Sequence, residues 1–213
     1  MGLGLSISSS SEGGGDFLPI VKYNASAGRW VRRDRYQDES GDWQSKNVDL
    51  TANFSAAFDV ADCEVGWLKF HDGVSKVTVP MGEPLPPQTS PDHKQGFSLP
   101  VKLSADCGGD IREFSSNAKV VCAVMDALVD KVEASAEYNK EAKIPIITCT
   151  GSNGVETKTP GGMSTNYAPI FEITGWITRD QFGSQAETET VDQPVQQTAP
   201  PPPAAGAVAA SQF

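Results

Sequence analysis

Apolar residues recur along this chain with two different periods, and the period of a β-strand is by far the commoner. In residues 97–104, "FSLPVKLS", apolar side chains alternate with others at every second position, as in a strand with one buried face. Segments rich in β-branched and aromatic residues, which favour strands, lie at 17–24, 28–36, 46–60, 63–73, 144–150 and 167–180. The sequence therefore predicts a mainly β protein.

Two local patterns refine this prediction. The turn-like residues 25–28, "ASAG", separate two strand-like segments, which indicates a β-hairpin from about Leu18 to Tyr36. Residues 151–162, "GSNGVETKTPGG", are rich in glycine and polar residues, so we expect them to form a loop between the last two strands.

One segment, at about residues 115–135, has the period of a helix instead. Its apolar residues are spaced i, i+3, i+4, i+7 and i+11, namely Val121, Val124, Met125, Leu128 and Val132. Ser115 or Ser116 could cap its first turn. A single amphipathic helix inserted late among strands is typical of the oligonucleotide/oligosaccharide-binding (OB) fold. We therefore predict an OB-like β-barrel whose end this helix covers, with a jelly roll or β-sandwich as the alternative.

The two ends of the chain differ in composition from its centre. Residues 1–16 are rich in serine and glycine, and residues 183–213 include a four-proline run and no basic residue. Segments of this kind bury too little apolar surface to fold, so we predict a barrel domain at 17–182 between two flexible arms. The chain has a net charge of -10. Because the central part is also acidic, a surface that binds anions must be a local patch.

Sequence motifs favour a non-enzymatic, soluble protein. No phosphate-binding loop, dinucleotide-binding glycine pattern or hydrolase motif is present, and a catalytic triad would have to use His71 or His93. The four cysteines are scattered without close pairs, so we expect reduced thiols and neither a metal nor a cofactor. No apolar run is long enough for a membrane span, and no secretion signal is present. We expect a cytoplasmic protein that does not bind membranes.

Basic and aromatic residues gather near the start of the predicted domain. Residues 28–38, "GRWVRRDRYQD", contain four arginines and two large aromatic residues. Proteins that hold single-stranded nucleic acid combine a basic groove with rings on which bases stack. The candidate binding residues are Trp30, Arg32, Arg33, Arg35, Tyr36, Trp43, Trp67, Lys69 and Lys102.

Strand geometry ranks these candidates. In an extended strand Trp30 and Arg32 share one face while Arg33 lies on the other. We therefore expect Trp30, Arg32 and Tyr36 to bind first, with Arg33 as an ordinary ion-pair partner. A structural role is the alternative, in which Trp30 and Trp67 belong to the core and the arginines pair with nearby acidic residues.

The domain and tail together suggest a family. A strand-rich body containing "KYNASAGRWVRRDR" and "NYAPIFEITGWITRD", followed by an acidic, proline-rich tail that ends in Phe213, resembles bacterial and phage single-stranded DNA-binding proteins. The resemblance implies that the barrel binds DNA and that the tail, through Phe213, recruits replication or recombination proteins. The dense aspartate run that usually precedes the terminal phenylalanine is absent here, since Glu187, Glu189 and Asp192 lie well upstream of it.

Three hypotheses of different classes follow. The first is a sequence-nonspecific single-stranded DNA-binding protein of a bacterium or a phage-infected cell, acting as a homodimer or in cooperative arrays. The second is a virion-associated or other structural β protein whose arms mediate assembly. The third is an enzyme or a carbohydrate-binding module that uses His71 or His93.

Overall fold

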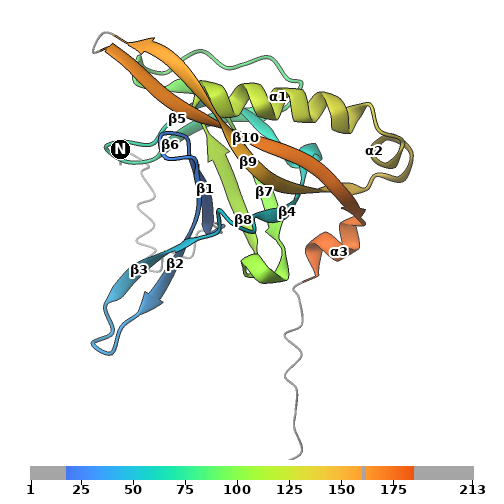
Figure 1. Cartoon of the computed structure of the whole chain (residues 1–213), viewed down its shortest axis with the longest axis horizontal. Coiled ribbons are helices and arrows are strands. Elements are labelled where there is room, and N and C mark those ends of the chain that lie inside the picture. The colour runs from blue at the N-terminus through green and yellow to red at the C-terminus, as the bar shows by residue number, and fades with distance from the viewer. Residues whose placement is uncertain (1–17, 160–161, 185–213) are drawn as a thin grey trace, which may run out of the picture.

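The computed structural model describes residues 18–159 and 162–184, and its strands form one large sheet (Figure 1). The strands are β1 (Ile20–Asn24), β2 (Arg29–Gln37), β3 (Trp43–Asp49), β4 (Ser55–Phe58), β5 (Glu64–Lys69), β6 (Ser75–Pro80), β7 (Lys94–Leu103), β8 (Ile111–Ser116), β9 (Ile144–Thr159) and β10 (Gly162–Ile177). The prediction of a mainly β protein is confirmed. So is the first hairpin, in which β1 and β2 pair antiparallel around residues 25–28.

The helical elements are short apart from one. They are α1 (Lys119–Glu133), α2 (Ala136–Glu141), α3 (Arg179–Gly183) and the 3-10 turns η1 (Val60–Asp62) and η2 (Ala105–Cys107). The predicted helix exists, and Val121, Met125, Leu128 and Val132 are buried on its inner face, which packs on β10 and β7. Its predicted start was wrong, because Ser115 and Ser116 belong to β8 and the N-cap position is occupied by Ala118, which forms no side-chain cap.

The predicted barrel must be corrected to an open sheet. Its strand order is β10-β9-β4-β7-β8-β1-β2-β3, while β5 pairs with β7 and β6 with β5. The β9–β10 hairpin crosses the sheet and meets the β1–β2 turn, where the Tyr167 N–H donates to the Ala25 carbonyl at 2.6 Å. No ladder among the described strands continues from this contact, so the sheet does not close. A separate two-sheet sandwich is not formed either, because all ten described strands belong to one sheet.

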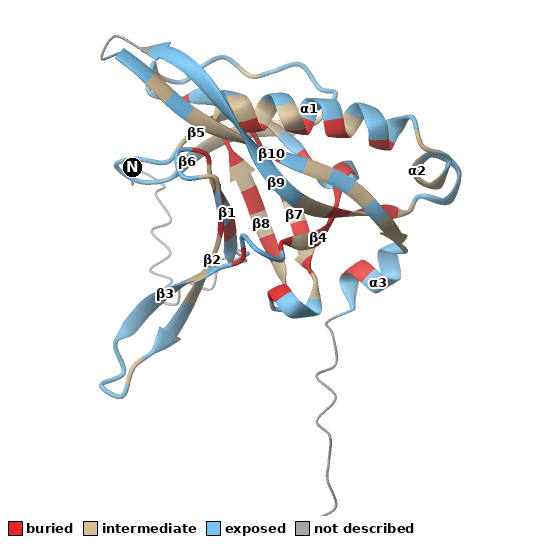
Figure 2. Ribbon diagram, viewed as in Figure 1, coloured by how far each residue is buried: buried red, intermediate tan, exposed pale blue. Residues whose placement is uncertain are grey.

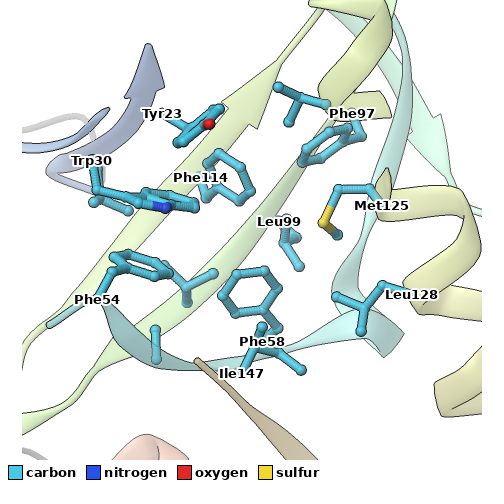
Figure 3. Close-up of a cluster of buried hydrophobic side chains, with 14 of the residues drawn as sticks. Tyr23, Trp30, Phe54, Phe58, Phe97, Leu99, Phe114, Met125, Leu128 and Ile147 are labelled. Atoms are coloured by element: carbon cyan, nitrogen blue, oxygen red, sulfur yellow. The ribbon is translucent and has the colours of Figure 1, made fainter. Parts of the chain in front are cut away.

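The core lies between the curved sheet, the β9–β10 hairpin and α1 (Figure 3). Trp30 is at its centre with no exposed surface, and its ring stacks on Phe54 with centroids 3.6 Å apart and planes 8° apart. Phe114 and Phe171 contact the same indole from β8 and β10. The alternating residues predicted in 97–104 are also confirmed as core, since Phe97, Leu99, Val101 and Leu103 are all buried.

The last two strands are longer than the sequence indicated. The predicted loop at 151–162 is wrong, because residues 151–159 pair with 162–170 and continue the β9–β10 ladder. Threonine and valine side chains in this segment favour an extended backbone, which the glycines do not prevent when a partner strand supplies hydrogen bonds. Strands β6 and β8 were not anticipated.

Two hairpins extend away from the buried core, as the exposed colouring of β2, β3 and the far end of β9–β10 shows (Figure 2). Strand β2 pairs with β1 only over residues 29–32, whereas residues 31–37 pair with β3. The outer part of β2–β3 therefore has no neighbouring strand to hold it against the body. In this outer part, residues 35–37 and 43–47 are exposed on both faces.

Among the described residues, no helix is long and apolar enough to span a membrane. The four cysteines are free thiols, of which Cys63 and Cys107 are buried. Burial raises the pKa of Cys63 to about 12, so this thiol stays protonated at neutral pH.

Candidate nucleic-acid interface

The register of β1, β2 and β3 decides which side chains share a face of the sheet. Tyr23 lies opposite Trp30, and both are buried in the core. Because successive side chains of a strand point to opposite faces, Arg29, Arg33 and Arg35 point away from the core. Val31 and Gln37 share this outward side, and so do the residues opposite them, which are Asp49 and Trp43 on β3 and Lys22 on β1.

These strands form a surface that we call the outer face, defined by Lys22, Arg29, Arg33, Arg35 and Trp43. Asp49 is the one acidic residue that the three strands contribute to it. The Asp49 carboxylate lies 3.9 Å from Arg29, and both side chains are more than half exposed, so this pair contributes little stability. Four basic side chains and one acidic side chain therefore share a surface of a protein whose net charge is -10.

Trp43 gives the outer face an exposed aromatic ring. It is 62% exposed, and the guanidinium carbon of Arg35 lies 5.3 Å from its ring centroid. This cation–π contact orients the ring while leaving aromatic surface open to solvent. Arg33, in contrast, donates one hydrogen bond to the Ser45 hydroxyl at 3.1 Å and forms no ion pair with any described residue. Its remaining donors face solvent.

Two of the three leading candidates must be corrected. Trp30 cannot stack on a base, because it is fully buried against Phe54. Arg32 is the ion-paired arginine: it donates to Asp34 at 2.8 and 3.1 Å and to the Cys107 carbonyl at 2.6 Å. Arg32, and not Arg33, is thus the arginine with an ion pair among the described residues. Tyr36 is 49% exposed, but it lies on the opposite side of the hairpin from Trp43.

The remaining candidates are not brought to the outer face. Trp67 and Lys69 belong to β5 and Lys102 to β7, which β8 and β1 separate from β2 in the sheet. Trp67 is half-buried and donates its indole N–H to the Pro86 carbonyl at 2.7 Å. Lys102 donates to the carbonyls of Gln181 and Ser184 at the end of α3. Phe213 lies outside the described residues.

A charged network at the base of the hairpin holds β2 against β8. The Arg112 side chain is only 7% exposed and donates to Asp34 at 2.7 Å and to Asp110 at 2.8 Å. Arg112 also donates to the Arg33 carbonyl at 3.0 Å. Burial acts to raise the pKa of Asp34, but hydrogen bonds from Arg32 and Arg112 outweigh it and hold this pKa below its usual value. The network thus links β2 to β8 and the segment before it at the base of the hairpin.

Replacing Asp34 by asparagine should therefore destabilise the protein at neutral pH and remove part of its sensitivity to acid. Leaving buried Arg112 with one carboxylate fewer should cost about 1–3 kcal/mol at pH 7. A carboxylate with a lowered pKa stabilises the fold above its unfolded pKa, here 3.8, and loses that contribution as pH falls through the folded value. Chemical denaturation of the original protein and of Asp34→Asn between pH 7 and 2.5 should show that their difference in free energy of unfolding shrinks below about pH 4. A difference that stays constant over this range would contradict the role of Asp34.

The structure adds two residues that the sequence analysis missed, Lys22 and Arg29. Lys22 lies on β1, and only the β1–β2 register places it beside the arginines of β2. The signal for Arg29 was available in the alternation of the strand: once Trp30 is assigned to the core, Arg29, Arg33 and Arg35 must point outward together.

Metal binding and catalysis by a histidine have less support among the described residues. Within 18–159 and 162–184, no three or more His, Cys, Asp or Glu side chains gather as a metal site would require. His71 is exposed, whereas His93 is buried with its Nε2 atom 3.1 Å from the Ser75 hydroxyl. Comparison with protein-family models, curated proteins and solved structures found no match to this chain. The case for function therefore rests on the residues themselves.

Proposed function

We propose that the protein binds single-stranded nucleic acid through the outer face, with single-stranded DNA as its main ligand and without sequence preference. The observation that carries this proposal is the excess of basic over acidic side chains on the outer face, beside an exposed tryptophan, in a strongly acidic protein. Neither feature is explained by the core, to which the outer face contributes no buried side chain.

Each part of the surface has a distinct task in this proposal. Lys22, Arg29, Arg33 and Arg35 bind phosphates, and their contribution falls as salt rises. Trp43 stacks on a base, which is worth about 1–3 kcal/mol per base and tolerates any sequence. The acidic remainder of the molecule repels the phosphate backbone and so confines it to the outer face.

The cellular role is an extension of the same proposal. A protein that holds single strands without reading sequence would serve DNA replication or recombination in the cytoplasm of a bacterium or a phage-infected cell. The acidic residues of 183–213 and Phe213 would then recruit partner proteins, as the resemblance to single-stranded DNA-binding proteins suggests. The protein would act without an enzymatic step.

Fluorescence anisotropy of a labelled oligo-dT provides the test. At 50 mM salt the full-length protein should bind, and the logarithm of the affinity should fall linearly with the logarithm of salt concentration. Each phosphate contact contributes a slope of about -0.7 for single strands, so four contacts predict a slope near -3. Absence of binding at low salt, or binding that does not respond to salt, would refute the proposal.

A second candidate function is structural assembly, which one observation favours. Strand β3 is the last strand on its side of the sheet, and its outer edge pairs with no described strand. Such edges can add a strand from another molecule. Light scattering after size-exclusion chromatography distinguishes the two functions, because an assembly protein forms large defined oligomers in the absence of DNA and has no affinity for it.

A further inference from the structure

A second surface of interest is an apolar pocket of about 420 Å³ between α1 and the sheet. Its floor is formed by Val65 and Phe97, which lie opposite each other on β5 and β7. Met125 and Val129 of α1 line its other wall, and Met81 also lines the pocket. Methionine side chains adapt their shape to different apolar partners. The pocket has the size of a small-ligand site, enough for about one or two large side chains.

The rim of this pocket is polar and carries an excess of positive charge. It includes Lys94, Lys119, Gln95 and Asp126, all of which are exposed. Neither lysine forms an ion pair with a residue in the described ranges. Two unpaired ammonium groups against one carboxylate favour an anionic occupant.

From these features we infer that the pocket docks a short acidic segment of a partner protein, with one apolar or aromatic side chain inserted between α1 and β7. The anchor fills the space lined by Val65, Phe97 and Met125, and carboxylates next to it in the partner meet Lys94 and Lys119. An apolar anchor inside a polar rim is the arrangement in which protein interfaces concentrate their affinity. The Gln95 amide can hydrogen-bond to a peptide backbone. A fatty acid has no such backbone, so this group favours a peptide as the occupant.

This docking site goes beyond the proposed function and does not depend on it. The pocket shares no residue with the outer face, and its lining comes from elements other than β1, β2 and β3. Nucleic acid and a partner protein could therefore be held at the same time. Loss of one activity would leave the other in place.

Amide NMR spectra of the 15N-labelled full-length protein test the inference. The probe is a capped tetrapeptide of two aspartates followed by phenylalanine and leucine. It should shift the signals of Gly96, Cys122 and Met125, which line the pocket. Reversing both lysines (Lys94→Glu with Lys119→Glu) should weaken this binding roughly tenfold, and Asp126→Lys should strengthen it about threefold, since an exposed charge changes affinity only modestly.

Three controls make the result decisive. Lys131→Glu reverses an exposed lysine of α1 that does not line the pocket, and it should leave peptide binding unchanged. A peptide with serines in place of phenylalanine and leucine should produce no shifts. Dodecanoate tests a lipid occupant. The inference is overturned if the acidic peptide causes no shifts or if the lysine reversals do not weaken peptide binding. It is also overturned if dodecanoate perturbs these signals and the peptide does not.

Discussion

Replacing Trp30 by alanine should destabilise the protein by about 3–5 kcal/mol, the usual cost of removing a large aromatic side chain from a core. Trp30 is fully buried and packs against Phe54, Phe114 and Phe171. For a chain of this length such a loss lowers the melting temperature by roughly 6–20 °C. Differential scanning calorimetry measures it, and Trp30→Phe provides a milder variant if the alanine protein does not fold.

Trp43→Ala is the matched control, because it removes the same side chain from a site that is 62% exposed. We expect its stability to stay within about 0.5 kcal/mol of the original protein, while affinity for oligo-dT falls by about 1–3 kcal/mol. Equal stability losses in the two variants would show that Trp43 is structural. Normal stability of Trp30→Ala would contradict the core described above.

Reversing two charges of the outer face, by Arg33→Glu with Arg35→Glu, should weaken oligo-dT binding at least about 100-fold. Loss of two charge-assisted contacts at about 1.5 kcal/mol each amounts to about 3 kcal/mol. The dependence on salt should become shallower by about 1.4 in logarithmic slope, since two phosphate contacts disappear. Anisotropy titrations over a range of salt concentrations measure both quantities.

The control for this variant is Lys131→Glu with Lys140→Glu, which makes the same change of net charge. Both lysines are exposed on α1 and α2, away from β1, β2 and β3. If binding depended only on the overall charge of the protein, the two double variants would lose affinity equally. A specific outer face predicts a much smaller effect for the helix variant.

The sequence was sufficient for the elements whose periodicity is strong. The apolar residues of 97–104 are buried, and so is the stripe of α1 apart from Val124, which is half-buried. Whether the sheet closes into a barrel could not be predicted from the sequence, because closure depends on strand pairings between residues far apart in the chain. Residues 151–159 show the same limit: their glycines indicate a loop, yet pairing with β10 extends the strand.

The candidate site shows why local composition alone is ambiguous. Strand alternation correctly separates Trp30 and Arg32 from Arg33 in the cluster at 28–38, but the face with Trp30 and Arg32 turns to the core and not to solvent. Burial of Trp30 decides the orientation of the whole strand, and this burial depends on Phe54, Phe114 and Phe171 from distant segments. Asp34 pairs with Arg32 and not with Arg33 because residues two apart share a face of a strand, and Arg112 of β8 binds the same carboxylate from a distant segment.

The central claim, that single-stranded nucleic acid binds the outer face, is tested most directly by tryptophan fluorescence during an oligo-dT titration of the original protein and of Trp43→Phe. Of the four tryptophans, only Trp43 is strongly exposed, so stacking on a base should quench its emission. We predict quenching of the original protein, and continued binding by Trp43→Phe, measured by anisotropy, with most of the quenching lost. No binding by either protein, or equal quenching of both, would contradict the account.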